Sequence, residues 1–250
     1  MAEIFRKLVH RPGYYHFLLI GAQLKGTTLL ATMVGRHTEV GIVNEDVTGR
    51  AIGAVLGKQL TGNKLCVPNQ IRLNRRSFVG ERFLKRVGLV AEAPKSRYCI
   101  RDYLELPNLK ILAIIRDGSD SVSSMMVRGK DRLKKAARRW GEAIETIYEL
   151  KQHYSDRVLV VSFDELLLYP DKVMGRVCEF LGLIFQERML DGYKYNPYYP
   201  ETELKTEKAH GEKQPHVQFR LSDLVPPAYA KYQELLSQSQ QASLKSALQR

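Results

Sequence analysis

Short apolar runs alternate with amphipathic segments along this chain. The runs typical of buried strands lie at residues 15–21, 39–45, 63–69, 109–117 and 157–164. The run LKILAIIRD is the clearest of them, because a parallel strand covered on both faces needs continuous apolar residues. Helices are predicted between the strands, at 27–37, 119–126, 133–154 and 171–183. This order predicts an α/β fold with a central parallel sheet flanked by helices.

The composition predicts a single domain over residues 1–250, with a core at about 15–190. Of the 250 residues, 44% are hydrophobic, which is enough for one substantial core. The polar stretch 236–250 predicts a loosely held helix or tail. No apolar run approaches the roughly 18 residues that span a bilayer, and the N-terminal apolar run is too short for a signal peptide. The three cysteines show neither paired nor metal-ligand spacing, so we expect a cytoplasmic protein without a membrane span.

The net charge of +12 is concentrated in two segments. Residues 72–101 hold nine Lys or Arg against two Glu, and residues 116–139 hold eight against three Asp. Such clusters raise the local concentration of anionic ligands. On charge alone, a phosphorylated nucleotide, a nucleic acid and an anionic membrane surface are all possible partners.

The segment GAQLKGTTLL at 21–30 joins a predicted strand to a predicted helix. In that context the backbone amides of the loop and of the helix N-terminus converge on an anion. Gly21 and Gly26 permit a tight turn, and Thr27 and Thr28 add hydroxyl donors. A Walker A loop has lysine where Thr27 stands, so this is a poor NTPase loop. It is either a phosphate loop of another kind or a plain strand–helix turn.

A second candidate phosphate site follows the clearest strand. Arg116 ends this strand, and Ser124 lies eight residues further on, in the predicted helix 119–126. Two helical turns bring the two side chains toward one ligand. An arginine offers two parallel donors to a phosphate, and a serine hydroxyl can bind another oxygen.

The two segments together resemble the sulfotransferase family that uses 3′-phosphoadenosine 5′-phosphosulfate (PAPS). In that family the first loop grips the 5′-phosphosulfate, and an arginine and a serine eight residues apart grip the 3′-phosphate. Arg116, Asp120 and Ser124 match the spacing R-x-x-x-D-x-x-x-S. Residues 62–71, 92–104 and 162–185 are similar as well, most of all to bacterial members. The resemblance implies a P-loop-like sulfotransferase fold, PAPS as co-substrate and no required metal.

The resemblance also implies which residues hold PAPS. They are the loop residues, the arginine–serine pair and the basic residue that ends the helix: Gln23, Leu24, Lys25, Gly26, Thr27, Thr28, Arg116, Ser124 and Arg128. The family usually has a lysine or arginine at the position of Leu24. Lys25 is therefore our candidate for stabilising charge on the leaving phosphate, with substitution by another cation as the alternative.

Glu45 is the candidate base, because it follows the second strand where related sulfotransferases acting on sugars or tyrosine carry a catalytic glutamate. The alternative is a solvated loop acid or a helix cap. His37 is a second catalytic candidate, with a surface or helix-capping role as its alternative. Lys95 and Arg97 resemble the loop that borders the acceptor beside Glu45, and a solvated basic face is the other interpretation.

The predicted function is transfer of a sulfuryl group to a hydroxyl or amine by in-line displacement. The expected partner is a small-molecule, sugar or lipid acceptor, and no nucleic acid. Four tyrosines could line the acceptor cleft or form a surface loop: Tyr193, Tyr195, Tyr198 and Tyr199. One alternative is a P-loop kinase or NTPase with Asp117 ending a Walker B strand. Another is a nucleotide- or polyanion-binding protein without catalysis.

Overall fold

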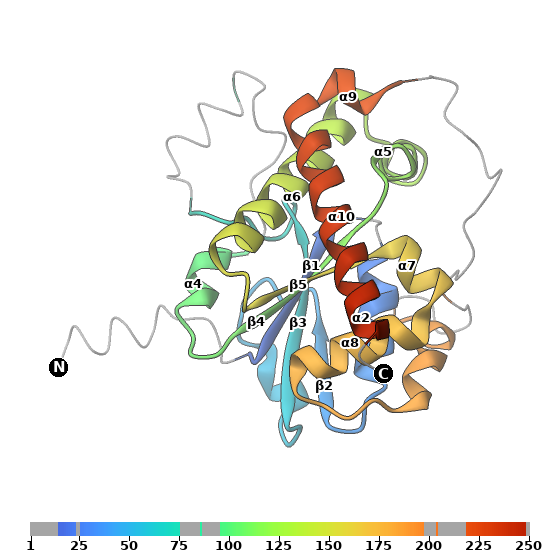
Figure 1. Ribbon diagram of the computed structural model, residues 1–250. Coiled ribbons are helices and arrows are strands. Elements are labelled where there is room, and N and C mark those ends of the chain that lie inside the picture. The colour runs from blue at the N-terminus through green and yellow to red at the C-terminus, as the bar shows by residue number, and fades with distance from the viewer. Residues whose placement is uncertain are drawn as a thin grey trace.

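The computed structural model describes residues 15–23, 26–75, 86, 96–197, 204 and 219–248. The described strands form one five-stranded sheet in the order β2-β3-β1-β4-β5, and every pair is parallel (Figure 1). Their bounds are β1 Phe17–Ala22, β2 Val40–Asn44, β3 Leu60–Val67, β4 Lys110–Ile115 and β5 Val158–Ser162. All five predicted strands are confirmed, although β3 begins three residues earlier than the apolar run indicates.

Helices connect these strands and cover the sheet. The described α-helices are α2 Thr27–Gly35, α4 Ile100–Leu104, α5 Gly118–Val127, α6 Leu133–His153, α7 Phe163–Leu168, α8 Pro170–Leu181, α9 Leu221–Leu224 and α10 Pro226–Leu248. Two 3₁₀ segments accompany them, η1 Ala51–Val55 and η2 Glu187–Lys194. The four predicted helices correspond to α2, α5, α6 and α8, whereas the short helices and the first part of α10 were not predicted.

The two faces of the sheet bury separate hydrophobic cores, because alternate residues of a strand point to opposite sides. In β1, Leu18 and Ile20 face the core that includes α5, α6 and α10. Phe17 and Leu19 face the core that includes α2 and α8. Trp140 of α6 is 1% exposed in the first core.

The topology predicts where a ligand binds. Strand β1 lies at the centre of the sheet between β3 and β4. Helix α2 follows β1 on one face, whereas α5 and α6 follow β4 on the opposite face. The chain therefore leaves these two adjacent strands in opposite directions, and α/β sheets bind ligands at the carboxyl ends of such strands.

The stretch 236–250, predicted as a loosely held helix or tail, begins inside a helix that is packed on the sheet as far as Ser239. Helix α10 runs beside α6 and along β5, the edge strand of the sheet (Figure 1). Ala228, Tyr232, Leu235 and Ser239 recur at spacings of three and four, and all are buried. The polar composition of this stretch gave no sign that Ser239 lies on the buried stripe of the helix.

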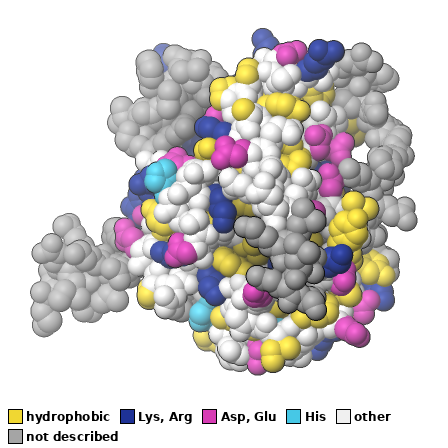
Figure 2. Space-filling model, in the orientation of Figure 1, with side chains coloured by type: hydrophobic (Ala, Val, Ile, Leu, Met, Phe, Trp, Pro, Cys, Tyr) yellow, Lys and Arg dark blue, Asp and Glu magenta, His cyan; other side chains and the backbone are white. Residues whose placement is uncertain are grey.

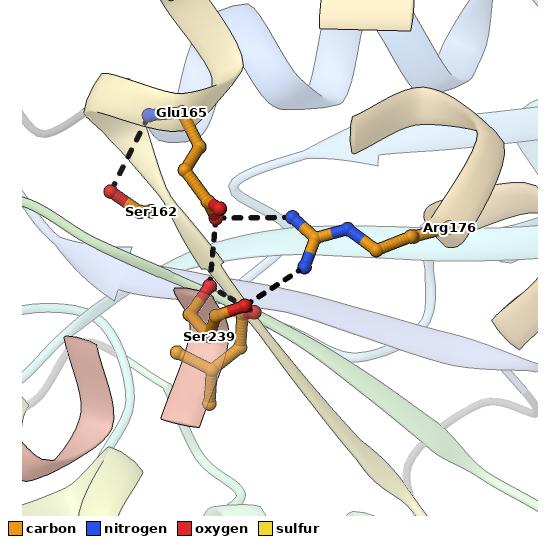
Figure 3. A network of polar contacts seen from close by, with 5 residues as sticks. Ser162, Glu165, Arg176 and Ser239 are labelled. Carbon is orange, nitrogen blue, oxygen red and sulfur yellow. Dashed lines mark hydrogen bonds and ion pairs between the residues drawn. The ribbon is translucent and has the colours of Figure 1, made fainter. Parts of the chain in front are cut away.

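A polar network joins α10 to the edge of the sheet (Figure 3). Arg176 of α8 donates to Glu165 Oε2 of α7 at 3.0 Å and to the carbonyl of Ser239 at 3.2 Å. The Ser239 hydroxyl donates to the same carboxylate oxygen at 2.9 Å and to the carbonyl of Val160 in β5 at 3.4 Å. These contacts satisfy polar groups that α10 would otherwise bury unpaired.

Among the described residues, no helix is long and apolar enough to cross a membrane. The predicted cytoplasmic localisation stays a prediction. On the face shown in Figure 2, Lys and Arg side chains are interspersed with Asp and Glu.

Candidate functional site

The loop between β1 and α2 brings backbone amides to the carboxyl end of the central strand. Helix α2 begins at Thr27, and Gly26 before it has a φ of 84°, in the left-handed region. No side chain of the described residues caps this helix. Its first amides are therefore available to an anion, which the helix dipole also favours.

Gly26 lies against the ring of Phe163, the first residue of α7. A methyl group at Gly26 would lie 2.2 Å from Phe163 Cδ2, so the contact and the left-handed backbone both require glycine. The guanidinium carbon of Arg116 lies 4.6 Å from the centroid of the same ring, within cation–π range. Phe163 thus connects the loop after β1 with the arginine after β4.

Arg116 and Ser124 lie on the elements that their spacing predicts. Arg116 Nη2 donates to Asp120 Oδ2 at 3.0 Å, so Asp120 orients the arginine. Arg116 Nε and Ser124 Oγ are both buried, and neither has a hydrogen-bond partner among the described residues. Leaving a buried polar group unsatisfied costs about 1–3 kcal/mol. Two such groups, one at the end of β4 and one in the helix that follows, indicate a missing polar ligand.

The start of α5 is held independently of any ligand. Asp117 caps the helix by accepting hydrogen bonds from the amides of Ser119 and Asp120, at 2.8 and 3.1 Å. The indole N–H of Trp140 donates to the carbonyl of Arg116 at 3.4 Å. The backbone that carries the arginine is thus anchored to both α5 and α6.

Glu45 lies directly after β2 and forms an ion pair with Lys64 of β3. The Glu45 Oε1 to Lys64 Nζ distance is 2.7 Å, and the two side chains are 35% and 1% exposed. Glu45 has a φ of 61°, which is strained for a residue other than glycine. The pair therefore holds a partly exposed carboxylate at the carboxyl ends of the strands, the same end of the sheet as the loop after β1.

A buried network around Asp46 fixes the backbone next to Glu45. Asp46 accepts hydrogen bonds from the Tyr15 hydroxyl at 2.8 Å, from the Thr48 hydroxyl at 2.5 Å and from the amide of Ala51 at 2.8 Å. Burial alone raises the pKa of Asp46, but hydrogen bonds from Thr48, Ala51 and Tyr15 outweigh it and hold the pKa below its usual value. Burial, and then the Asp46 carboxylate, raise the pKa of Tyr15. The hydrogen bonds to Asp46 thus favour its charged form and connect it to Tyr15, Thr48 and Ala51.

His37 lies away from the other candidates. It follows α2 at the end opposite to the phosphate loop and is 2% exposed. Its Nδ1 accepts from the amide of Glu39 at 3.2 Å, so its Nε2 donates to the carbonyl of Ile184 at 2.9 Å. Both ring nitrogens are thus engaged in hydrogen bonds to the backbone, and the structure does not bring this histidine to Glu45.

The structure describes some of the remaining candidates but not all of them. Gln23 is exposed and accepts a hydrogen bond from Asn69, beyond the end of β3. The amide of Arg97 donates to the carbonyl of Val47 at 3.3 Å, two residues beyond Glu45, and the arginine side chain is exposed. Arg128 is exposed at the end of α5. Five candidates lie outside the described residues: Leu24 and Lys25 of the loop, Lys95, Tyr198 and Tyr199.

Three residues of this region were missed by sequence reasoning. Lys64 had one visible signal, a lysine inside the apolar run NKLCVPN. Phe163 and Asp46 had none, because a phenylalanine after a strand and an aspartate in a loop are both common. Among the described residues, no group of three or more His, Cys, Asp or Glu side chains could hold a metal ion.

Comparisons with known proteins agree with this geometry. Residues 96–187 match the model of the sulfotransferase family. The chain is 27% identical over 195 residues to protein-tyrosine sulfotransferase 1 of Danio rerio, covering 68% of this chain and 54% of the relative. It is 27% identical over 195 residues to protein-tyrosine sulfotransferase 2 of Gallus gallus, covering 68% and 52%. The chain thus spans about half the length of these curated relatives.

Solved structures share the fold at low sequence identity. The sulfotransferase domain of the Synechococcus PCC 7002 olefin synthase aligns with a TM-score of 0.57 and 16% identity, over 88% of this chain and 95% of that domain. The sulfotransferase domain of the curacin biosynthetic pathway aligns with a TM-score of 0.51 and 13% identity, over 91% and 97%. Part of this chain, residues 96–187, is therefore similar to the sulfotransferase family, the curated relatives are protein-tyrosine sulfotransferases, and the solved sulfotransferase domains share its fold.

Proposed function

We propose that this protein transfers a sulfuryl group from PAPS to a hydroxyl acceptor. The observation that carries the proposal is the pair of buried, unsatisfied groups, Arg116 Nε and Ser124 Oγ. A 3′-phosphate bound between them would accept hydrogen bonds from both, and a charged hydrogen bond stabilises a complex by about 1.5–3 kcal/mol. The Asp120 carboxylate is bound by Nη2, and Nε has no hydrogen-bond partner among the described residues, so Nε is available to this phosphate.

The 5′ end of the nucleotide fits the loop after β1. The amides at the start of α2 and the Thr28 hydroxyl would bind the phosphosulfate, and Gly26 lets its oxygens approach the backbone closely. The nucleotide would then extend past Phe163, whose ring contacts both Gly26 and Arg116. A kinase or NTPase is less well supported, because Thr27 occupies the lysine position of a Walker A loop.

PAPS supplies an activated sulfuryl group, and the protein supplies orientation and a base. In our proposal Glu45 accepts the proton of the acceptor hydroxyl while the acceptor oxygen attacks sulfur in line with the leaving phosphate. Lys64 keeps the Glu45 carboxylate in position through its 2.7 Å contact. The helix dipole of α2, together with Lys25, would stabilise negative charge on the leaving group.

Binding of 3′,5′-diphosphoadenosine, the product nucleotide, tests the proposal directly. We expect this diphosphate to raise the melting temperature of the protein, with or without a metal chelator, because a ligand that binds only the folded state stabilises it. Stabilisation by ATP only when magnesium is present would support the kinase alternative. Binding of the diphosphate without turnover of PAPS on any hydroxyl acceptor would support the non-catalytic alternative.

The variant Arg116→Ala should weaken binding of the diphosphate by about 1–3 kcal/mol, measured by isothermal titration calorimetry, because it removes a charged hydrogen-bond partner of the phosphate. Arg188→Ala is the matched control, since Arg188 is an exposed arginine of η2 away from this site. Equal affinities of the Arg116 variant and the wild-type protein would contradict the proposed nucleotide site.

A further inference from the structure

A cavity of about 430 Å³ lies beside α2, displaced from the proposed reaction centre toward the C-terminal end of that helix. It is lined by the second half of α2, by β2 and by the segment after η2, and includes Thr32, Arg36, Ile42, Asn44, Tyr195 and Asn196. Pockets for small organic ligands usually measure roughly 300–1,000 Å³ and combine apolar walls with a few polar groups. The lining of this cavity has that character, with Ile42 among its apolar walls and Arg36 among its polar groups.

The cavity leads toward the proposed reaction centre. Asn44 lines it and directly precedes Glu45, and the Cα atom of Asn44 pairs with that of Lys64 across the sheet. Thr32 also lines the cavity and lies one helical turn after Thr28. Its hydroxyl donates a hydrogen bond to the carbonyl of Thr28 at 3.1 Å. A molecule in the cavity can therefore place one end near Glu45 and the phosphosulfate loop.

Arg36 marks the other end of the cavity. Its guanidinium carbon lies 4.0 Å from the centroid of the Tyr195 ring, and its Nε is buried without a hydrogen-bond partner in the described part of the chain. No ion pair joins it to a carboxylate of that part. The second basic residue of the lining, Lys194, is paired with Asp191 at 2.9 Å. Within the described residues, Arg36 thus has no anionic partner.

We propose that this cavity binds the sulfate acceptor and that Arg36 recognises a carboxylate at the end of the acceptor opposite to the reacting hydroxyl. The inference rests on the proposed function. Eight residues of helix separate Thr28 from Arg36, so the two groups of the acceptor lie roughly 12 Å apart. A single arginine balances a single negative charge, which suits a carboxylate better than a phosphate dianion. Tyr195 offers its ring face to the guanidinium.

Two probes that differ only in charge test this inference. They are 4′-hydroxybiphenyl-4-carboxylate and the corresponding carboxamide, titrated calorimetrically into the protein with and without 3′,5′-diphosphoadenosine. We expect the wild-type protein to bind the carboxylate about tenfold or more tightly than the amide, because only the carboxylate forms a charged hydrogen bond with Arg36. Arg36→Gln should remove this preference and leave binding of the amide within about twofold, and Arg188→Gln should preserve the preference.

Each outcome separates this inference from the proposed function. A carboxylate preference that survives in Arg36→Gln, equal binding of the two probes by the wild-type protein, or binding of neither would overturn the inference. None of these results bears on the binding of 3′,5′-diphosphoadenosine, which tests the proposed function alone. If the diphosphate does not bind but the carboxylate preference depends on Arg36, the cavity is an anion-binding site and the proposed function fails. Thermal unfolding of both variants verifies that they are folded.

Discussion

Replacement of Arg176 by alanine is expected to lower the free energy of unfolding by about 3–5 kcal/mol, because it leaves a buried carboxylate without its cation. The Arg176 side chain is 8% exposed and the Glu165 side chain 15%. The same change removes the hydrogen bond from Arg176 to the carbonyl of Ser239, which ties α10 to α8 (Figure 3). Urea denaturation followed by circular dichroism measures the loss.

The matched control is Arg101→Ala. Arg101 forms an ion pair with Glu149 at 3.0 Å, but these side chains are 53% and 42% exposed. Such surface pairs contribute about 0–1 kcal/mol, because water and salt screen them. If both variants lose the same small amount, the network at α10 does not stabilise the fold in the way we infer.

Replacement of Glu45 by glutamine is expected to slow sulfuryl transfer by about two orders of magnitude or more, because an amide cannot accept the acceptor proton. Binding of 3′,5′-diphosphoadenosine should be unchanged, since the proposed phosphate contacts come from other residues. The rate is measured in single turnover with radiolabelled PAPS and the acceptor that the wild-type protein sulfates fastest. Calorimetry gives the nucleotide affinity of the same preparation.

Two further variants refine this result. Glu39→Gln replaces an exposed glutamate that directly precedes β2, at the opposite end of the strand from Glu45. This variant should leave turnover unaffected. Lys64→Met removes the cation that holds the Glu45 carboxylate, so turnover should fall while nucleotide affinity stays the same. Wild-type turnover in Glu45→Gln would mean that another group takes the proton.

The regular elements of the fold could be predicted because they depend on neighbouring residues. The apolar run 109–117 indicated β4, and the apolar spacing in 133–154 indicated α6; both are present within about three residues of those bounds. Prediction from apolar spacing failed where a polar residue lies on the buried side of a helix. Ser239 lies on the buried side of α10 because its hydroxyl finds a carboxylate and a carbonyl there, and neither partner is close in sequence.

The candidate site likewise has a part that the sequence could predict and a part that it could not. Arg116 and Ser124 lie eight residues apart on consecutive elements, so their spacing alone predicted that they could share a ligand, and the structure adds that both have buried, unsatisfied atoms. The role of His37 depended on Ile184, 147 residues away. No local pattern could show that its ring was already engaged.

The sequence by itself therefore determined the α/β class, the order of the strands along the chain and the residues of the two candidate phosphate-binding segments. These features follow from periodicity and from spacing within one strand–helix unit. Only the tertiary structure decided that Lys64 pairs with Glu45, that Phe163 contacts both Gly26 and Arg116, and that Arg36 lies over Tyr195 in a cavity beside β2. The physical reason is that strand order in the sheet and side-chain packing bring together residues that are distant in sequence, and neither is encoded in any single segment.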